Sequence, residues 1–179
     1  MRSIILASTA LLALASCAAP VIVPQPAPPA PLPTPTPTPA PRPTPAPTLG
    51  SDWRDWPLTP GNWVYRQDPR GSIALYGRSG ADAELTLRCD KARGKLYLSR
   101  RSDAAGALTI RTSTTLKTLD ALPAGGAPAY AAVELAPRDA IIDAIGFSRG
   151  RFVVQGGGAT DLVVPAWPEI LRVAEDCRG

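Results

Sequence analysis

Histidine is absent from the 179 residues of this chain, and cysteine occurs only three times. Without histidine the chain cannot build a Ser-His-Asp site, a Cys-His site or a zinc site with histidine ligands. The spacing Ser-x-x-Lys, which a serine–lysine site would use, is also missing. These absences remove the commonest hydrolase and metalloenzyme designs. The sequence therefore predicts no catalytic residue, no metal ligand and no cofactor.

A strong excess of one charge is missing as well. The chain has 19 Lys and Arg against 15 Asp and Glu. Arg2 and Arg42 are the only charged residues before residue 50, so the remainder carries a formal charge of +2. A nucleic-acid-binding domain concentrates much more basic charge on one face. We therefore expect no nucleic-acid partner.

No apolar run is long enough for a membrane-spanning helix, which needs about 20 residues. The N-terminal apolar stretch, Ile4 to Leu14, has 11 residues and follows Arg2. A short basic start, an apolar stretch and small residues before a break are typical of an export signal. The break here is the sequence Leu14-Ala15-Ser16-Cys17.

Leu14-Ala15-Ser16-Cys17 resembles the lipobox of bacterial lipoproteins. The resemblance implies that residues 1–16 are a signal peptide and that acyl chains on Cys17 hold the protein to a membrane. Ala18 stands where an aspartate commonly retains lipoproteins in the inner membrane. The resemblance thus implies a lipid-anchored protein of the bacterial cell envelope, at the outer membrane and facing the periplasm. The alternative is an ordinary secretory signal, cleaved nearby, with an incidental Cys17.

Proline is concentrated after this signal, with 14 of the 22 prolines lying between Pro20 and Pro47. Proline fixes φ and lacks an N–H donor, so near-alternating proline favours an extended polyproline II spacer. We predict a lipidated proline-rich linker at residues 17–49 that acts as a stalk. The alternative is a PxxP ligand for a partner's groove. Residues 50–179 are enough for a single globular domain.

Alternating apolar and polar residues, separated by turn-like segments, dominate this domain. The expected strands are Asn62–Gln67, Ser72–Gly77, Ala83–Cys89, Lys95–Arg100, Ala107–Thr114, Ala129–Leu135, Arg151–Gln155 and Leu162–Val164. Short helices are expected at 137–146 and 168–177. Six to eight strands with two short helices predict an α+β fold, as an antiparallel β-sandwich or a strongly bent sheet with the helices at its edge.

The two remaining cysteines, Cys89 and Cys177, are expected to form a disulfide. Alternation over Leu85–Cys89 puts Cys89 on the inner face of a strand. The spacing of apolar residues over Ile170–Cys177 puts Cys177 on the apolar face of a helix. Both side chains thus point inward, and a bond would link the last helix to an early strand. The alternative is two separate buried thiols.

Two sets of residues are candidates for binding. Trp53 and Trp56 open the domain, where exposed aromatic rings would stack on sugars or meet a protein partner; alternatively they cover the core. Arg149 and Arg151 flank Gly150 and could clamp an anion between two guanidinium groups. The alternative for the arginines is a turn into an edge strand, with both paired to Asp or Glu.

Asp139 and Asp143 lie at positions i and i+4 of the expected helix 137–146. Two carboxylates buried together can perform acid–base chemistry. Acidic residues in the first turns of a helix are more often solvated and are favoured there by the helix dipole. The pair is therefore a candidate for a carboxylate-based hydrolase only if the two side chains share a pocket.

The order of elements from about residue 119 to 176 is similar to the C-terminal half of invasion-associated locus B-type proteins, which are small exported β-rich proteins of bacteria. The similar order comprises Leu122–Gly125, a strand, the helix Asp139–Ile145, two strands and a terminal helix. The chain lacks the extra cysteines usual in that family, so the resemblance implies no functional residue. Segments Phe147–Phe152 and Val164–Cys177 resemble uncharacterised bacterial lipoproteins, which implies no activity.

These features favour a non-enzymatic, membrane-anchored envelope lipoprotein whose domain is a binding or structural module for a protein or cell-wall partner. The alternatives are a periplasmic inhibitor of lysozyme-type or protease-type enzymes and a carboxylate-based hydrolase. A deep pocket holding Asp139 or Asp143 would favour the hydrolase. A protruding loop without a pocket would favour the inhibitor, and a flat face with exposed Trp53 or Trp56 would favour the binding module.

Overall fold

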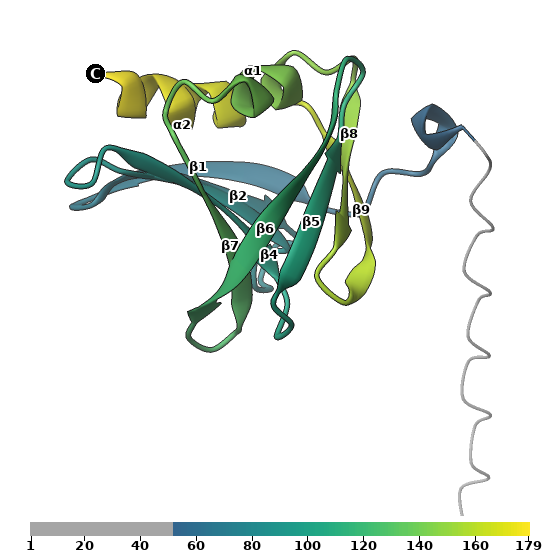
Figure 1. Ribbon diagram of the computed structural model, residues 1–179, viewed down its shortest axis with the longest axis horizontal. Helices are drawn as coiled ribbons and strands as arrows, with labels where there is room; N and C mark the ends of the chain where they lie inside the picture. Colours follow the sequence, from purple (N-terminus) through teal and green to yellow (C-terminus); the bar gives the residue numbers. More distant parts are fainter. Residues whose placement is uncertain (1–51) are drawn as a thin grey trace, which may run out of the picture. The chain divides into compact units, whose positions relative to one another are not determined.

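A computed structural model describes residues 52–179, and Figure 1 shows their arrangement. In this part of the chain, nine strands form one open sheet in the order β1-β2-β3-β4-β7-β6-β5-β8-β9, with every neighbouring pair antiparallel. The strands are β1 Asn62–Asp68, β2 Gly71–Gly77, β3 Leu85–Asp90, β4 Lys95–Arg101, β5 Gly106–Arg111, β6 Leu116–Gly125, β7 Tyr130–Leu135, β8 Arg151–Gly156 and β9 Ala159–Pro165. The helices are η1 Trp53–Asp55, a 3-10 turn, and the α-helices α1 Ala140–Gly146 and α2 Glu169–Arg178.

The expected signal and linker, and with them Cys17 and the boundary at residue 50, lie outside the described residues. Those predictions therefore stay open. Neither α-helix in residues 52–179 is long and apolar enough to cross a bilayer.

The predicted α+β class and the antiparallel pairing are confirmed, but the strand count was too low. The additional strand is β6, which joins the β1–β4 meander, through β7, to the strands β5, β8 and β9. Its register with β7 shifts between Pro123 and Gly125. Proline cannot donate to a ladder and glycine weakens a strand, so this end of β6 has little strand signal in the sequence.

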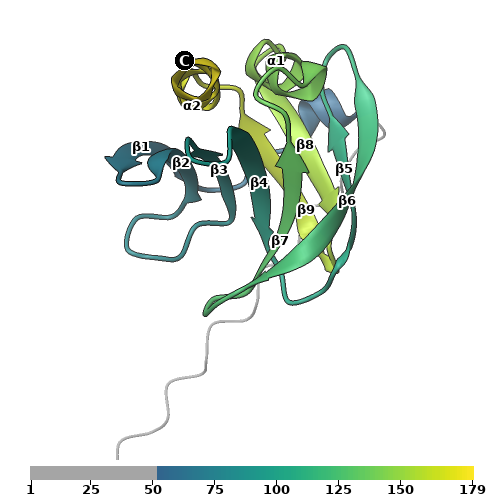
Figure 2. The ribbon, with the colours of Figure 1, turned by 60° about the vertical axis from the view of Figure 1, so that its left-hand side comes forward.

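The single sheet bends sharply, so that its two halves diverge beneath the helices (Figure 1). Helix α2 packs on the face formed by β1, β2 and β3, and α1 packs beside α2. Figure 2 shows both helices on the same side of the sheet. Buried side chains from both halves meet below them and form the main core: Tyr76, Leu85, Leu87, Leu96, Leu98, Leu108, Ile110, Ile142, Phe152, Val154, Ile170 and Val173.

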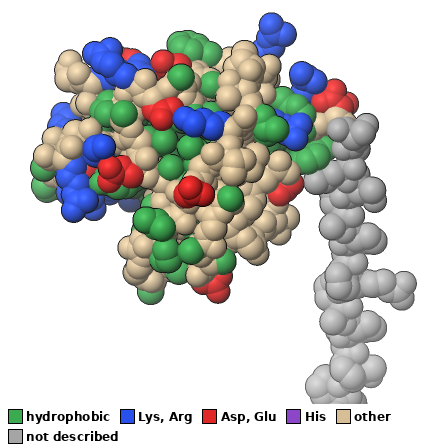
Figure 3. All heavy atoms as spheres, viewed as in Figure 1, with side chains coloured by type: hydrophobic (Ala, Val, Ile, Leu, Met, Phe, Trp, Pro, Cys, Tyr) green, Lys and Arg blue, Asp and Glu red, His purple; other side chains and the backbone are tan. Residues whose placement is uncertain are grey.

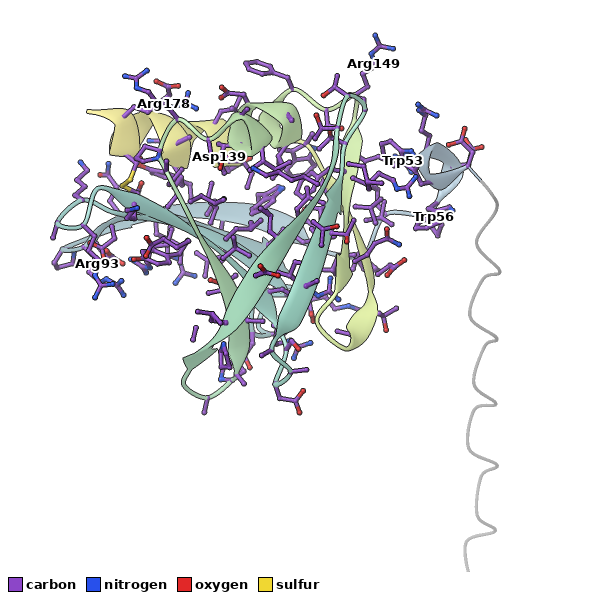
Figure 4. All side chains as sticks on the ribbon, in the orientation of Figure 1. Trp53, Trp56, Arg93, Asp139, Arg149 and Arg178 are labelled. Atoms are coloured by element: carbon purple, nitrogen blue, oxygen red, sulfur yellow. A yellow bond between two sulfur atoms is a disulfide. The ribbon has the colours of Figure 1, made fainter. Side chains whose placement is uncertain are left out.

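The expected disulfide joins Cys89 on β3 to Cys177 on α2, with the two Cα atoms 5.4 Å apart. Cys89 is completely buried, as alternation along its strand predicted. In Figure 4 the sulfur–sulfur bond is visible between α2 and the sheet. The covalent link therefore holds the last helix over the first three strands.

One glycine is required where β8 passes close to β5. Gly156, the last residue of β8, has a φ of 97°, a region that L-residues with a side chain rarely adopt. A Cβ atom placed there would lie only 2.2 Å from the carbonyl oxygen of Ala107. Both the backbone angle and the contact exclude a side chain, so the pairing of these two strands depends on this residue.

The start of β1 and the end of β9, at opposite ends of the strand order, approach each other where Trp63 contacts Pro165, without forming a ladder. We call this place the seam. The chain segment at 57–61 crosses it before entering β1. Thr59 donates its N–H to the Val163 carbonyl at 2.9 Å and accepts the Val163 N–H on its hydroxyl at 3.0 Å. The indole of Trp63 donates to the Pro165 carbonyl at 2.9 Å. These bonds hold the two ends of the sheet together and leave a hollow beside them.

Candidate functional site

The hollow at the seam, which we call the seam pocket, has a volume of about 970 Å³. Its walls come from the segment 57–60, the ends of β4 and β9, and the turn before β7. Several lining residues are apolar: Pro57, Leu58, Pro60, Ala129, Leu162 and Val163. A largely apolar concavity of this size is typical of small-molecule sites.

Arg100 is the buried charged residue of this pocket, with only 2% of its surface exposed. It lies on the inner face of β4, two and four residues after the core residues Leu98 and Leu96. Its Nη1 donates to the Val154 carbonyl at 3.2 Å, and its Nη2 donates to the Thr160 carbonyl. The side chain thereby ties β4 to the β8–β9 hairpin across the interior.

The charge of Arg100 has no directly paired carboxylate within residues 52–179, and its buried Nε has no hydrogen-bond partner there. Burial lowers the pKa of the Arg100 guanidinium, while the negative charges of Glu84 and Asp161 oppose that shift. Arginine nevertheless stays protonated in proteins. The pocket therefore contains a buried positive charge that is balanced only at longer range.

The carboxylates near Arg100 are engaged by other groups. Glu84 forms an ion pair with Arg101, and Asp161 accepts a hydrogen bond from the Gln155 side-chain amide at 2.7 Å. The two remaining charged lining residues, Arg78 and Asp103, are exposed at the rim. The charged lining residues other than Arg100 therefore carry a net charge of −1, and none of their carboxylates contacts Arg100 directly.

The predicted aromatic cluster covers the core instead of forming an exposed face. Trp53 is 8% exposed and packs on Val153 and Val163, on the side of β8 and β9 away from the main core. Trp56 is partly buried in the same cluster. Figure 4 shows Trp53 directed from η1 toward the sheet. Of the two interpretations of these tryptophans, the structure agrees with cover of the core and not with a flat, exposed binding face.

The two candidate arginines have separate roles. Arg151 donates to the Trp56 carbonyl and so helps hold η1 against the sheet. Arg149 is exposed, and Figure 4 shows it projecting away from the domain. Because the Arg151 guanidinium is already engaged, the pair does not present a two-armed anion clamp.

The two candidate carboxylates are separated by their partners. Asp139 caps α1 by accepting the Ile141 N–H at 3.0 Å and pairs with Lys117 at 3.1 Å. Although partial burial opposes it, these two partners hold the pKa of Asp139 below its usual value. Asp143 pairs with Arg178 at 2.7 Å. Neither carboxylate lines the seam pocket, so the geometry does not favour a shared proton or a carboxylate-based hydrolase.

Sequence reasoning missed Arg100, although one signal pointed to it. The alternation that places Leu96 and Leu98 on the inner face of β4 also places Arg100 there, and an inward-facing arginine is unusual. The pocket itself had no local signal, because its walls come from segments up to 106 positions apart, between Pro57 and Val163.

Other surfaces show less organisation. Figure 3 shows positive and negative side chains interspersed over the visible face, without one large patch of a single sign. In the part of the chain that the structure describes, no three His, Cys, Asp or Glu residues are grouped as metal ligands would be. Comparison with protein-family models, with curated proteins and with solved structures finds no match for this chain.

Proposed function

We propose that this protein is a lipid-anchored lipoprotein of the bacterial cell envelope whose C-terminal domain is a non-enzymatic binding module. The anchoring half of the proposal comes from the resemblance of Leu14-Ala15-Ser16-Cys17 to a lipobox. The disulfide between Cys89 and Cys177 supports it, because such bonds persist in oxidising compartments outside the cytosol.

The binding half is carried by one observation, the seam pocket with Arg100 at its base. The pocket combines apolar walls with one buried charge, which is the usual composition of a ligand site. Three of its hydroxyl and carboxyl groups have partners inside the domain: Ser102 donates to the Gly157 carbonyl, Glu84 pairs with Arg101, and Asp161 accepts from Gln155. This arrangement favours recognition over acid–base chemistry.

An inhibitor of lysozyme-type or protease-type enzymes is the second candidate. The turn between β6 and β7 projects from the domain, and Figure 3 shows hydrophobic side chains gathered at that end. Leu122, at this end of β6, is 71% exposed. Such a turn could enter an enzyme's cleft. Inhibition of lysozyme or periplasmic proteases by the purified chain, lost on Leu122→Asp, would establish this candidate in place of the first.

The test of anchoring uses the full chain expressed in a bacterium with two membranes. We expect the wild type in the outer-membrane fraction, with acyl groups on Cys17 detected by mass spectrometry of the N-terminal peptide. Cys17→Ser should move the protein to the soluble fraction, whereas Cys89→Ser, the matched control, should stay with the membrane. An unmodified, soluble wild type would refute the anchor.

The test of the binding module is crosslinking in intact cells, followed by identification of what is captured. We expect an envelope protein, a cell-wall fragment or an envelope small molecule to be recovered with the wild type. Turnover of a substrate by the pure protein, with nothing captured, would contradict a non-enzymatic module.

A further inference from the structure

The seam pocket contains a buried charge, Arg100, that no carboxylate of residues 52–179 contacts directly. Arginine is almost never fully buried without a partner, because removing a charge from water is costly. Of the five N–H donors of the Arg100 guanidinium, two have acceptors in residues 52–179, namely the carbonyls of Val154 and Thr160. Carbonyls supply hydrogen-bond acceptors but no negative charge. A ligand with a carboxylate would supply both.

The rest of the ligand must suit the walls around Arg100. Leu58, in the segment before β1, is 44% exposed, and Leu162 on β9 lines the same pocket with 4% of its surface exposed. Burying apolar surface against these side chains is favourable by roughly 25 cal/mol per Å². The walls therefore fit an apolar body attached to the charged group.

A peptide is less suited to this place than a small molecule. Peptides commonly bind by adding a strand to an exposed sheet edge. At Val163 the edge of β9 is already occupied, since Thr59 bonds both the N–H and the carbonyl of that residue. The ligand therefore depends on side-chain walls and on Arg100 instead of a backbone ladder.

The nearby carboxylates limit the ligand's charge. Glu84 and Asp161 line the pocket, and both are held by partners in the domain, Arg101 and Gln155. They would repel a second negative group at the mouth, and Arg100, which is 2% exposed, is the group that a single carboxylate would have to approach. The site is thus matched to a single negative charge.

We propose that the seam pocket binds an aliphatic monocarboxylate, with its carboxylate on Arg100 and its chain along the wall formed by Leu58 and Leu162. The proposal rests on the function proposed above, since it names the ligand class of that binding module. Arg100 then acts as the ligand's anchor as well as a tie between β4 and the β8–β9 hairpin.

The experiment is calorimetric titration of the full chain carrying Cys17→Ser, which is free of acyl groups that would compete with the probes. The probes are decanoate, decan-1-ol and decylammonium, which share a chain and differ in charge. We expect decanoate to bind at least tenfold more tightly than decan-1-ol, and decylammonium to bind most weakly. Equal affinities for decanoate and decan-1-ol would overturn the proposal.

Two variants locate the site. Arg100→Met should weaken decanoate binding by roughly tenfold to a hundredfold, the range for charge-assisted hydrogen bonds, and leave decan-1-ol within threefold. The matched control is Arg138→Met, because Arg138 is exposed and lies outside the pocket. If Arg100→Met and Arg138→Met bind decanoate alike, Arg100 is structural only and the proposal fails.

A third variant keeps the test decisive if Arg100→Met does not fold, which circular dichroism would show. Ala159 is exposed and lines the pocket, so Ala159→Trp should fill the mouth without removing a core contact. We expect it to weaken decanoate and decan-1-ol together by at least tenfold. Unchanged decanoate binding would place the site elsewhere and refute the proposal.

Failure of this inference differs from failure of the proposed function. If an envelope partner is captured in cells but decanoate does not bind, the binding module stands and the ligand class is wrong. If decanoate binds as expected but Cys17→Ser does not change the membrane fractionation, the pocket stands and the anchor is wrong.

Discussion

Removal of the disulfide is the perturbation with the largest expected effect on the fold. The double variant Cys89→Ala, Cys177→Ala frees the last helix from β3, and 88 positions separate the two cysteines. The chain-entropy relation for a closed loop of this length gives a loss of about 4–5 kcal/mol in the free energy of unfolding. That is a large part of the roughly 5–15 kcal/mol that stabilises a typical domain.

The apolar face of α2 should keep this helix packed on the sheet after the disulfide is removed. Ile170, Val173 and Ala174 are completely buried, so we expect the helix to stay docked in the variant under native conditions. We therefore expect a folded protein with reduced stability and not an unfolded one. Amide exchange in α2 should rise more than in β5 and β8, because α2 loses its covalent link.

Urea unfolding followed by tryptophan fluorescence measures this loss. With a typical urea dependence of 1–3 kcal/mol per molar, a loss of 4–5 kcal/mol should lower the midpoint by roughly 1.3–5 M. Wild type treated with a reducing agent should match the double variant, and Cys17→Ala, outside the described residues, should leave the midpoint unchanged. A shift below about 0.5 M would show that the loop-closure reasoning is wrong.

Three further changes test the packing and the helix cap. Gly156→Ala should lower the free energy of unfolding in urea by at least about 2 kcal/mol. The control Gly94→Ala should lower it by about 1 kcal/mol, because nothing lies near the new Cβ there. Equal losses would contradict the close contact with β5. Trp53→Ala should lower the free energy of unfolding by about 3 kcal/mol. Trp167 is 43% exposed, so Trp167→Ala should lower it by less than about 1 kcal/mol. The reverse order would show that Trp53 does not cover the core. Asp139→Ala should cost about 1 kcal/mol at pH 7. Because folding lowers the pKa of Asp139, its contribution is present above the unfolded pKa and disappears as the pH falls through the folded one. Unfolding of wild type and variant at pH 7 and pH 2.5 should show that difference shrinking, and a constant difference would contradict the role of the charge.

Most strands could be predicted because their signal is local. Over Leu85–Cys89 and Lys95–Arg100 the apolar residues alternate, which is the period of a half-buried strand. The strand β6 has no such pattern, since most of its residues are exposed and Pro123 and Gly125 interrupt its end. Its place in the sheet comes from pairing with β5 and β7, and a single local window contains neither partner.

The disulfide was predictable for the same reason, and the pocket was not. Cys89 and Cys177 each lie on an apolar face that the local period reveals, so an inward direction followed from each segment alone. The seam pocket depends on how far the sheet bends and on where Thr59 meets Val163. Those are long-range contacts whose geometry no local pattern contains.

The roles of the tryptophans and of Arg100 follow from which faces of the bent sheet need cover. On β8 and β9 the residues Val153 and Val163 point away from the main core, so a second apolar surface would face water without η1. Trp53 covers that surface, and Arg151 fixes η1 by its bond to the Trp56 carbonyl. At the seam the segment 57–60 lies between β1 and β9, and the seam pocket beside it is lined by the buried Arg100. Val163 belongs to both places, since it packs with Trp53 and also lines the seam pocket, so the cover over β9 and the candidate binding site adjoin each other.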